Sequence, residues 1–129
     1  MWQRRSLSDK QRNFAHFALG EQGEKRAQVF LRSLGWSILH TNLRLKHKEL
    51  DIIAIDCQKN ELVFVEVKTR SSDFFGSPAL AVTQKKLRAL QSVSRIFLRS
   101  IKWGGAYRFD TIAVSSGKIH HYKNVTWLM

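Results

Sequence analysis

The segment Leu62-Val-Phe-Val-Glu-Val-Lys68 decides the fold class of this chain. Side chains alternate across a strand, so the even-numbered residues are expected on one face and the three valines on the other. Because both faces are apolar, the segment is typical of a central strand covered on both sides. Glu66 and Lys68 follow at its carboxyl end, on the face that Phe64 marks as buried. Such charges need partners, and a mutual ion pair and a functional site both remain open here.

The flanking sequence predicts a single α/β domain with a central mixed sheet flanked by helices, in the order α-β-β-β-α-β-β. Residues 1–13 are polar and basic and are expected to form a flexible arm, which leaves 14–129 as the domain. Apolar residues three or four apart indicate the helices, and large or β-branched apolar runs indicate the strands. Helices are expected at 14–34 and 83–100, and strands at 36–43, 50–55, 62–69, 107–115 and 118–127.

The net charge indicates the class of partner. The 129 residues include 22 Lys and Arg against 10 Asp and Glu, a net charge of +12. So basic a domain favours an anionic partner, and nucleic acid is preferred over a membrane surface. No apolar run approaches the roughly 18 residues of a membrane span. The first residues lack an export signal and Cys57 is the single cysteine, so a cytoplasmic protein is expected.

The distribution of the acidic residues is more specific than their number. Five of the ten carboxylates fall between Glu49 and Glu66. A hairpin between residues 55 and 62 would bring Asp51 and Glu66 toward the same end of the sheet. Glu24 lies on the apolar stripe of the first helix, although a carboxylate near a helix start is also favoured by the helix dipole. Carboxylates that converge inside a basic protein predict a divalent cation that meets a phosphate.

Each predicted site residue has a chemical role. Asp51 and Glu66 are expected to bind Mg²⁺ or Mn²⁺, and the carbonyl of Val67 offers a further oxygen ligand. Lys68 points the same way as Glu66 and would orient a water or stabilise developing negative charge. The five histidines and one cysteine lack the spacing of a zinc site, so no zinc is expected.

The chain also resembles a known family over about residues 20–114. The matching positions are Gly23-Glu24, Gly35-Trp36, Asn42-Leu-Arg44, Glu49-Leu-Asp-Ile-Ile-Ala54, Phe64-Val-Glu-Val-Lys-Thr-Arg70, Phe75-Gly76, Lys86 and Arg108-Phe-Asp110. These are similar to the YraN-like family (uncharacterised protein family 0102). Asp51 with Glu66-Val-Lys68 also resembles the motif of the PD-(D/E)XK nuclease superfamily.

That resemblance implies a restriction-endonuclease-like core, similar to archaeal Holliday-junction resolvases. It implies Asp51 and Glu66 as metal ligands, Lys68 as the catalytic lysine and Glu24 as an accessory catalytic acid. Leu50 stands where the superfamily motif has proline, and Lys48 stands where the family is expected to have glycine. The loop into Asp51 is therefore expected to be looser in this chain.

Three basic or polar groups of residues are candidates for contacts with nucleic acid, and a solvated surface is the alternative for each. One is a basic loop before Asp51, one follows Lys68, and one opens the second helix, where backbone N–H groups also attract phosphate. They are Arg44, Lys46 and Lys48; Thr69 and Arg70; and Gln84, Lys85 and Lys86.

Together these features predict a Mg²⁺-dependent DNA endonuclease, with branched or damaged DNA as candidate substrates. The alternatives are a nucleic-acid-binding protein that keeps the nuclease fold without catalysis, and a structural role on an RNA-rich particle. One centre per chain cuts one strand, so opposing cuts would need a homodimer. Asp56 and Glu61 are interpreted as turn and surface residues, and Asp110 as a buried acid paired with an arginine.

Overall fold

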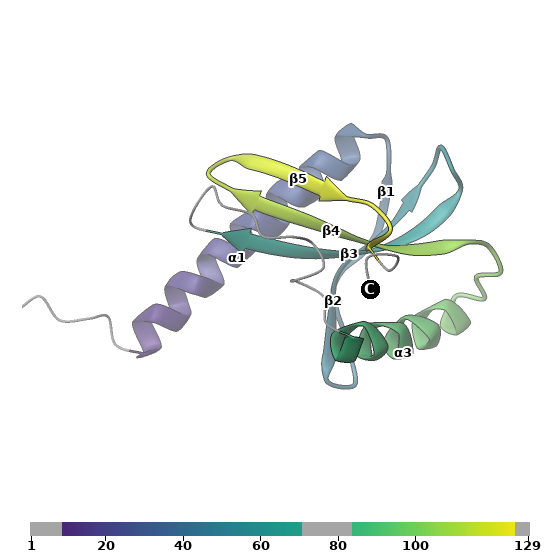
Figure 1. Cartoon of the computed structure of the whole chain (residues 1–129), viewed down its shortest axis with the longest axis horizontal. Helices are drawn as coiled ribbons and strands as arrows, with labels where there is room; N and C mark the ends of the chain where they lie inside the picture. The colour runs from purple at the N-terminus through teal and green to yellow at the C-terminus, as the bar shows by residue number, and fades with distance from the viewer. Residues whose placement is uncertain (1–8, 71–83, 126–129) are drawn as a thin grey trace, which may run out of the picture.

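The computed structural model describes residues 9–70 and 84–125, with side chains for 20–69 and 85–125. The elements are α1 (Asp9–Ser33), β1 (Ser37–Leu45), β2 (Lys48–Asp56), β3 (Glu61–Arg70), α3 (Gln84–Ser100), β4 (Tyr107–Ser115) and β5 (Lys118–Tyr122). The strands form one sheet in the order β1-β2-β3-β4-β5, in which only the β3–β4 pair is parallel. The expected α/β fold with a mixed sheet is confirmed, and Figure 1 shows this arrangement.

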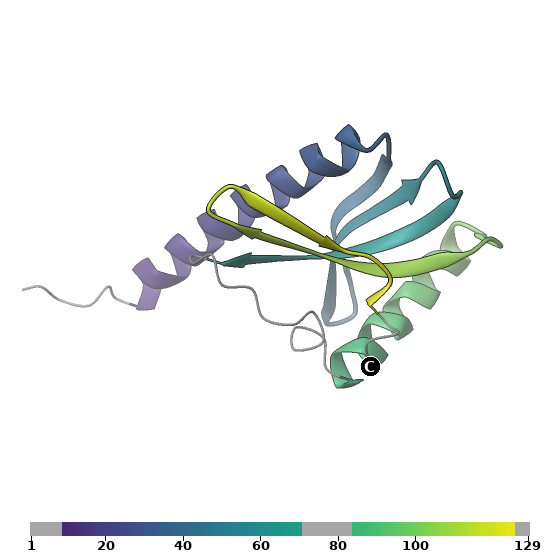
Figure 2. The ribbon, with the colours of Figure 1, turned by 45° about the horizontal axis from the view of Figure 1, so that its top comes forward.

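The two helices cover opposite faces of this sheet, as Figure 2 shows. Under α1, Ala27 and Leu31 pack on the face of β3 that carries Val63 and Val65. Under α3, the core includes Phe64 with residues 90, 93, 97 and 98 of the helix. The expectation that 62–68 is a central strand covered on both sides is therefore confirmed. Burial on both faces is the main source of stability for such a strand.

Some predicted element boundaries were wrong. The first helix begins at Asp9 instead of Phe14, so part of the predicted arm is helical, while residues 1–8 lie outside the described residues. The predicted basic loop at 44–48 is a two-residue turn, because β1 and β2 continue to Leu45 and Lys48. The last strand ends at Tyr122 instead of residue 127. Asn124 adopts a positive φ of 53° and its N–H donates to Asp110, which turns the chain out of the sheet.

A buried ionic network closes the far end of the sheet. Arg108 donates to Asp110 (Nε–Oδ1 3.0 Å) and to Asp56 (Nη1–Oδ2 3.1 Å), and its guanidinium lies 5.1 Å from the ring of Trp36. Asp110 also meets His121 Nε2 at 2.8 Å. The predicted pairing of Asp110 with an arginine is confirmed. The interpretation of Asp56 as a surface residue was wrong, since it is 2% exposed and accepts from turn amides as well as from Arg108.

Candidate metal centre

Asp51 lies at the point where β2 separates from β3. The backbone pairing of the two strands ends at Ile52 and Val65. One step further, the Val67 N–H donates to Asp51 Oδ2 at 2.8 Å, so a carboxylate takes the place of a backbone acceptor. Leu50 packs under α3 and Ile52 packs under α1, so the alternation of faces breaks around Asp51. Asp51 is thereby held in the gap between two strands.

Glu24 reaches the same place from α1. Its carboxylate accepts a hydrogen bond from the side chain of Asn42 on β1 and lies close to Asp51. Asn42 has a positive φ of 53°, a conformation that asparagine adopts more readily than most residues. The helix comes close to the sheet because the preceding residue is Gly23, which packs directly on Thr69. Glu24 is thus positioned by contacts with two strands.

Gly23→Ala is expected to destabilise the protein by about 1–3 kcal/mol, because an added Cβ would overlap the Thr69 hydroxyl. In an exposed helix the same change would stabilise the helix by about 1 kcal/mol, so the clash decides whether Gly23→Ala raises or lowers the free energy of unfolding. Urea denaturation measures the effect. Adding Thr69→Ala removes the overlapping hydroxyl and should restore most of the loss. Equal stabilities of wild type and Gly23→Ala would show that the close packing does not position α1.

Three carboxylates meet at this point. One carboxylate oxygen from each of Glu24, Glu49 and Asp51 lies within 4.8 Å of the other two. Glu49 was not among the residues that the sequence singled out as a site. The available signal was its place two residues before Asp51, which puts both on one side of β2. Oxygen atoms from three separate carboxylates are a donor set suited to Mg²⁺ or Mn²⁺.

The electrostatics of the cluster favour a positive charge. Burial, together with the nearby Glu66 and Glu49 carboxylates, raises the pKa of Asp51 to about 6, although the Val67 N–H and Lys48 act in the other direction. Burial and the charge of Asp51 also raise the pKa of Glu24, against the lowering effect of its bond with Asn42. Carboxylates that repel one another in this way are stabilised by a cation placed between them.

Glu66 and Lys68 form an ion pair beside this cluster. Lys68 Nζ lies 3.1 Å from Glu66 Oε1, with side chains 27% and 16% exposed. Glu66 also lines a small cleft that includes Lys48, Glu49, Asp51 and Leu90. The sequence-predicted pair Asp51 and Glu66 thus shares one cleft, whereas the close group of three carboxylates contains Glu49 in place of Glu66. Val67 contributes its N–H to Asp51.

The predicted nucleic-acid contacts fall in different places. Lys48 lines the cleft, and Arg44 and Lys46 are exposed on the β1–β2 hairpin. Lys85 and Lys86 are exposed in the first turn of α3. Thr69 instead faces α1 at Gly23, away from the cleft. The backbones of Arg70 and Gln84 end β3 and begin α3, and their side chains lie outside the described part.

Fold and site together define a small mixed α/β protein with a carboxylate cluster where two central strands separate. The chain belongs to the uncharacterised protein family UPF0102, whose model matches residues 23–114. It is 40% identical to a UPF0102 protein of Thermodesulfovibrio yellowstonii over 110 residues, 85% of this chain and 96% of the relative. A UPF0102 protein of Cytophaga hutchinsonii is 36% identical over 112 residues, 86% of this chain and 97% of the relative. Among residues 9–70 and 84–125, neither helix has the length and hydropathy of a membrane span.

Proposed function

We propose that this protein is a divalent-metal-dependent endonuclease that hydrolyses phosphodiester bonds of DNA. The observation that carries the proposal is the group of Glu24, Glu49 and Asp51, whose carboxylate oxygens approach within 4.8 Å in a chain of net charge +12. A polyanion-binding surface alone has no use for carboxylates that converge and repel one another. A cation held there explains the cluster, and a polyanionic substrate explains the positive charge of the chain.

The carboxylates fit Mg²⁺ or Mn²⁺, with Glu24, Glu49 and Asp51 as the ligands and Glu66 close by in the cleft. When bound, such a cation polarises a phosphodiester oxygen and lowers the pKa of a water molecule. Asp51 is fixed by the Val67 N–H, so its free oxygen keeps one direction. Lys68 is held by Glu66 at the edge of the cleft, where its ammonium would donate to a phosphate oxygen.

Cleavage of end-labelled DNA tests this proposal. Single-stranded, duplex, flap and four-way-junction DNA would each be incubated with Mg²⁺, Mn²⁺ or EDTA. We expect products only with metal and none from Lys68→Ala, which removes the ammonium at the edge of the cleft. The substrate cut fastest identifies the preferred DNA shape. A folded protein that binds DNA and cuts none of these substrates would contradict the proposal.

The alternative is a nucleic-acid-binding protein that keeps the fold without catalysis. The Glu66–Lys68 ion pair favours it, because each of these two groups already has a partner at 3.1 Å. Under this alternative, EDTA and Asp51→Asn would leave DNA affinity almost unchanged and no DNA would be cut. The two functions are therefore separated by metal dependence.

Metal affinity is expected to depend on pH near 6. Since the pKa of Asp51 is raised from 3.8 to about 6, a proton must leave this group before a cation binds at lower pH. Mn²⁺ affinity in calorimetric titrations should therefore rise up to about tenfold per pH unit below pH 6 and level off above pH 7. The stability of the metal-free protein has the opposite dependence on pH. Its folded state holds this proton more tightly, so its stability falls as the pH rises from about 4 to about 6. A flat Mn²⁺ affinity from pH 5 to 7 would contradict this role of Asp51.

A further inference from the structure

The outer face of α3 carries a row of cations that the candidate metal centre does not use. Lys85, Arg88, Arg95 and Arg99 are all exposed and recur three, seven and four residues apart, which places them along one side of the helix. No aspartate or glutamate occurs between residues 84 and 109 of the sequence. With a rise of about 1.5 Å per residue, the row extends over about 21 Å.

These cations have no acidic partners in the described part of the chain. The ion pairs there join other residues, and none involves Arg88, Arg95 or Arg99. Four like charges on one helix side repel one another, and nothing in the described fold compensates them. An unneutralised row of this kind is suited to a ligand with regularly spaced negative charges.

The apolar face of α3 argues against a membrane as that ligand. Helices that lie on a bilayer insert their apolar face among the lipids. In α3 that face is committed to the core, where Leu90, Val93, Phe97 and Leu98 are each at most 8% exposed. The exposed side of α3 carries the cations together with Ile96, which is 37% exposed, and this predominantly charged side favours the phosphate backbone of nucleic acid.

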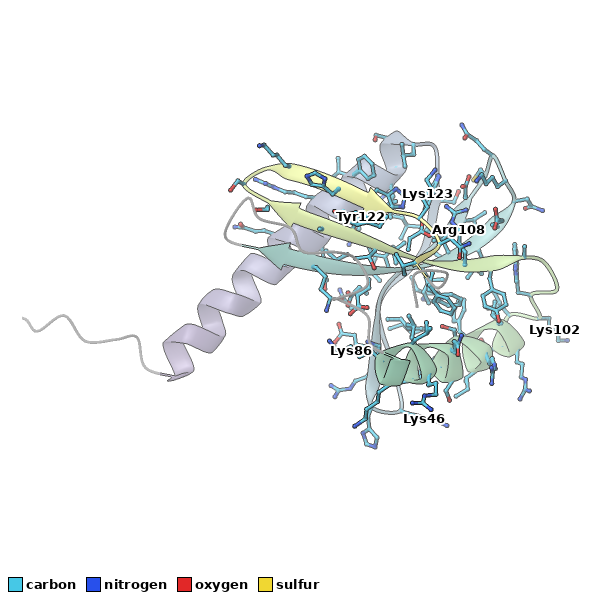
Figure 3. All side chains as sticks on the ribbon, viewed as in Figure 1. Lys46, Lys86, Lys102, Arg108, Tyr122 and Lys123 are labelled. Atoms are coloured by element: carbon cyan, nitrogen blue, oxygen red, sulfur yellow. The ribbon has the colours of Figure 1, made fainter. Side chains whose placement is uncertain are left out.

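The helix that carries the row borders the candidate metal centre in its first half, on the side opposite the row. Leu90 of α3 lines the cleft of Asp51 and Glu66, so the first half of the helix borders the site. In Figure 3, Lys86 lies at the start of α3 and Lys102 just beyond its other end. A straight row of about 21 Å matches roughly six base pairs, and a duplex is stiff over such a length.

We infer that the outer face of α3 binds the phosphate backbone of a DNA duplex. Lys85, Arg88, Arg95 and Arg99 each contact a phosphate, and the contacts require no metal. This binding does not rest on the proposed function. The surface holds the duplex without reading its sequence, since phosphate contacts carry no base information.

The test compares two triple variants with equal loss of charge. The first is Arg88→Gln with Arg95→Gln and Arg99→Gln. The control is Arg32→Gln with Lys59→Gln and Lys118→Gln, three exposed cations on α1, on the β2–β3 turn and at the start of β5. Affinity for a 20-base-pair DNA duplex is measured in EDTA at several salt concentrations, after circular dichroism has confirmed that each variant is folded. EDTA prevents cleavage, so this binding result is independent of whether the protein is a nuclease.

We expect the α3 variant to bind at least about tenfold more weakly than wild type. The slope of log affinity against log salt should fall in magnitude by about 2.7, that is about 0.9 for each of three lost phosphate contacts. The control should change the slope by less than about 1. Equal changes in the two variants, or no binding of wild type to the duplex, would overturn the inference. Tighter binding to a matched RNA duplex would overturn the assignment to DNA. If the α3 variant lost binding to vesicles of anionic phospholipid but kept its affinity for the DNA duplex, the inference would be overturned in favour of a membrane.

Discussion

Asp51→Asn is expected to abolish metal-dependent cleavage, with a rate loss of about 1,000-fold or more, while DNA affinity in EDTA stays the same or becomes tighter. The substitution removes one of three converging carboxylates, so the cation loses a charged ligand. It also removes a negative charge that repels the DNA backbone. The amide oxygen of asparagine can still accept the Val67 N–H, so the local fold is kept. Initial cleavage rates and equilibrium DNA binding measure the two effects separately.

Glu21→Gln is the matched control for this experiment. Glu21 is an exposed carboxylate on α1, paired with Lys25 at 3.7 Å, and does not belong to the group of three. Its removal should leave the cleavage rate within about twofold of wild type. Equal losses in Asp51→Asn and Glu21→Gln, or persistent cleavage by Asp51→Asn, would contradict the role of Asp51 as a ligand.

Asp110→Asn is expected to lower the free energy of unfolding by about 3–5 kcal/mol, although it lies away from the candidate centre. Asp110 is 1% exposed and accepts from Arg108, His121 and the Asn124 N–H. The neutral amide leaves the buried guanidinium with much less compensating charge and sets an NH₂ group against one of these donors. Urea denaturation measures the loss.

Glu61→Gln is the control for Asp110→Asn. Glu61 contacts the same guanidinium at 3.4 Å but its side chain is 25% exposed, so its loss should cost less than about 1 kcal/mol. A difference of less than 1 kcal/mol between the two variants would show that the network does not stabilise the fold.

The same network should make wild type sensitive to acid. Burial alone would raise the pKa of Asp110, but the hydrogen bonds from His121 and Arg108 outweigh it and hold the pKa below its usual value of 3.8. The resulting stability is present above pH 4 and is lost as the pH falls through the lowered pKa of the folded state.

Much of the fold could be predicted because its pattern is local. The strand at 62–68 is indicated by a run of apolar residues, and α3 by the spacing of Leu87, Leu90 and Val93. Both patterns depend only on neighbours in the sequence, and both elements occur as expected. The burial of Asp56 and its pairing with Arg108 could not be predicted in this way. Its position after a strand is typical of a turn, and only the fold brings Arg108, 52 residues later, within 3.1 Å of it.

The candidate site, too, could be predicted only in part from the local sequence. Strict alternation along β2 predicted Asp51 on the same face as Ile53, at the same end of the sheet as Glu66. In the structure the alternation breaks at Asp51, and its carboxylate meets Glu24 from the helix on the other face of the sheet. Glu49 was overlooked as a ligand although it lies two residues before Asp51, because only the fold brings Glu24 to these two carboxylates. Lys48, predicted as a nucleic-acid contact and noted as a departure from the family pattern, lines the cleft and lowers the pKa of Asp51.

Titration of Mn²⁺ into the metal-free protein, followed by electron paramagnetic resonance at pH 7.5, tests most directly whether Glu24, Glu49 and Asp51 hold one cation. We expect one ion per chain in wild type and in Glu21→Gln. In Glu49→Gln the affinity should be at least about tenfold weaker, and in Asp51→Asn binding should be lost. One ion bound with equal affinity in all four proteins, or no bound ion in wild type, would contradict the metal centre and with it the proposed nuclease.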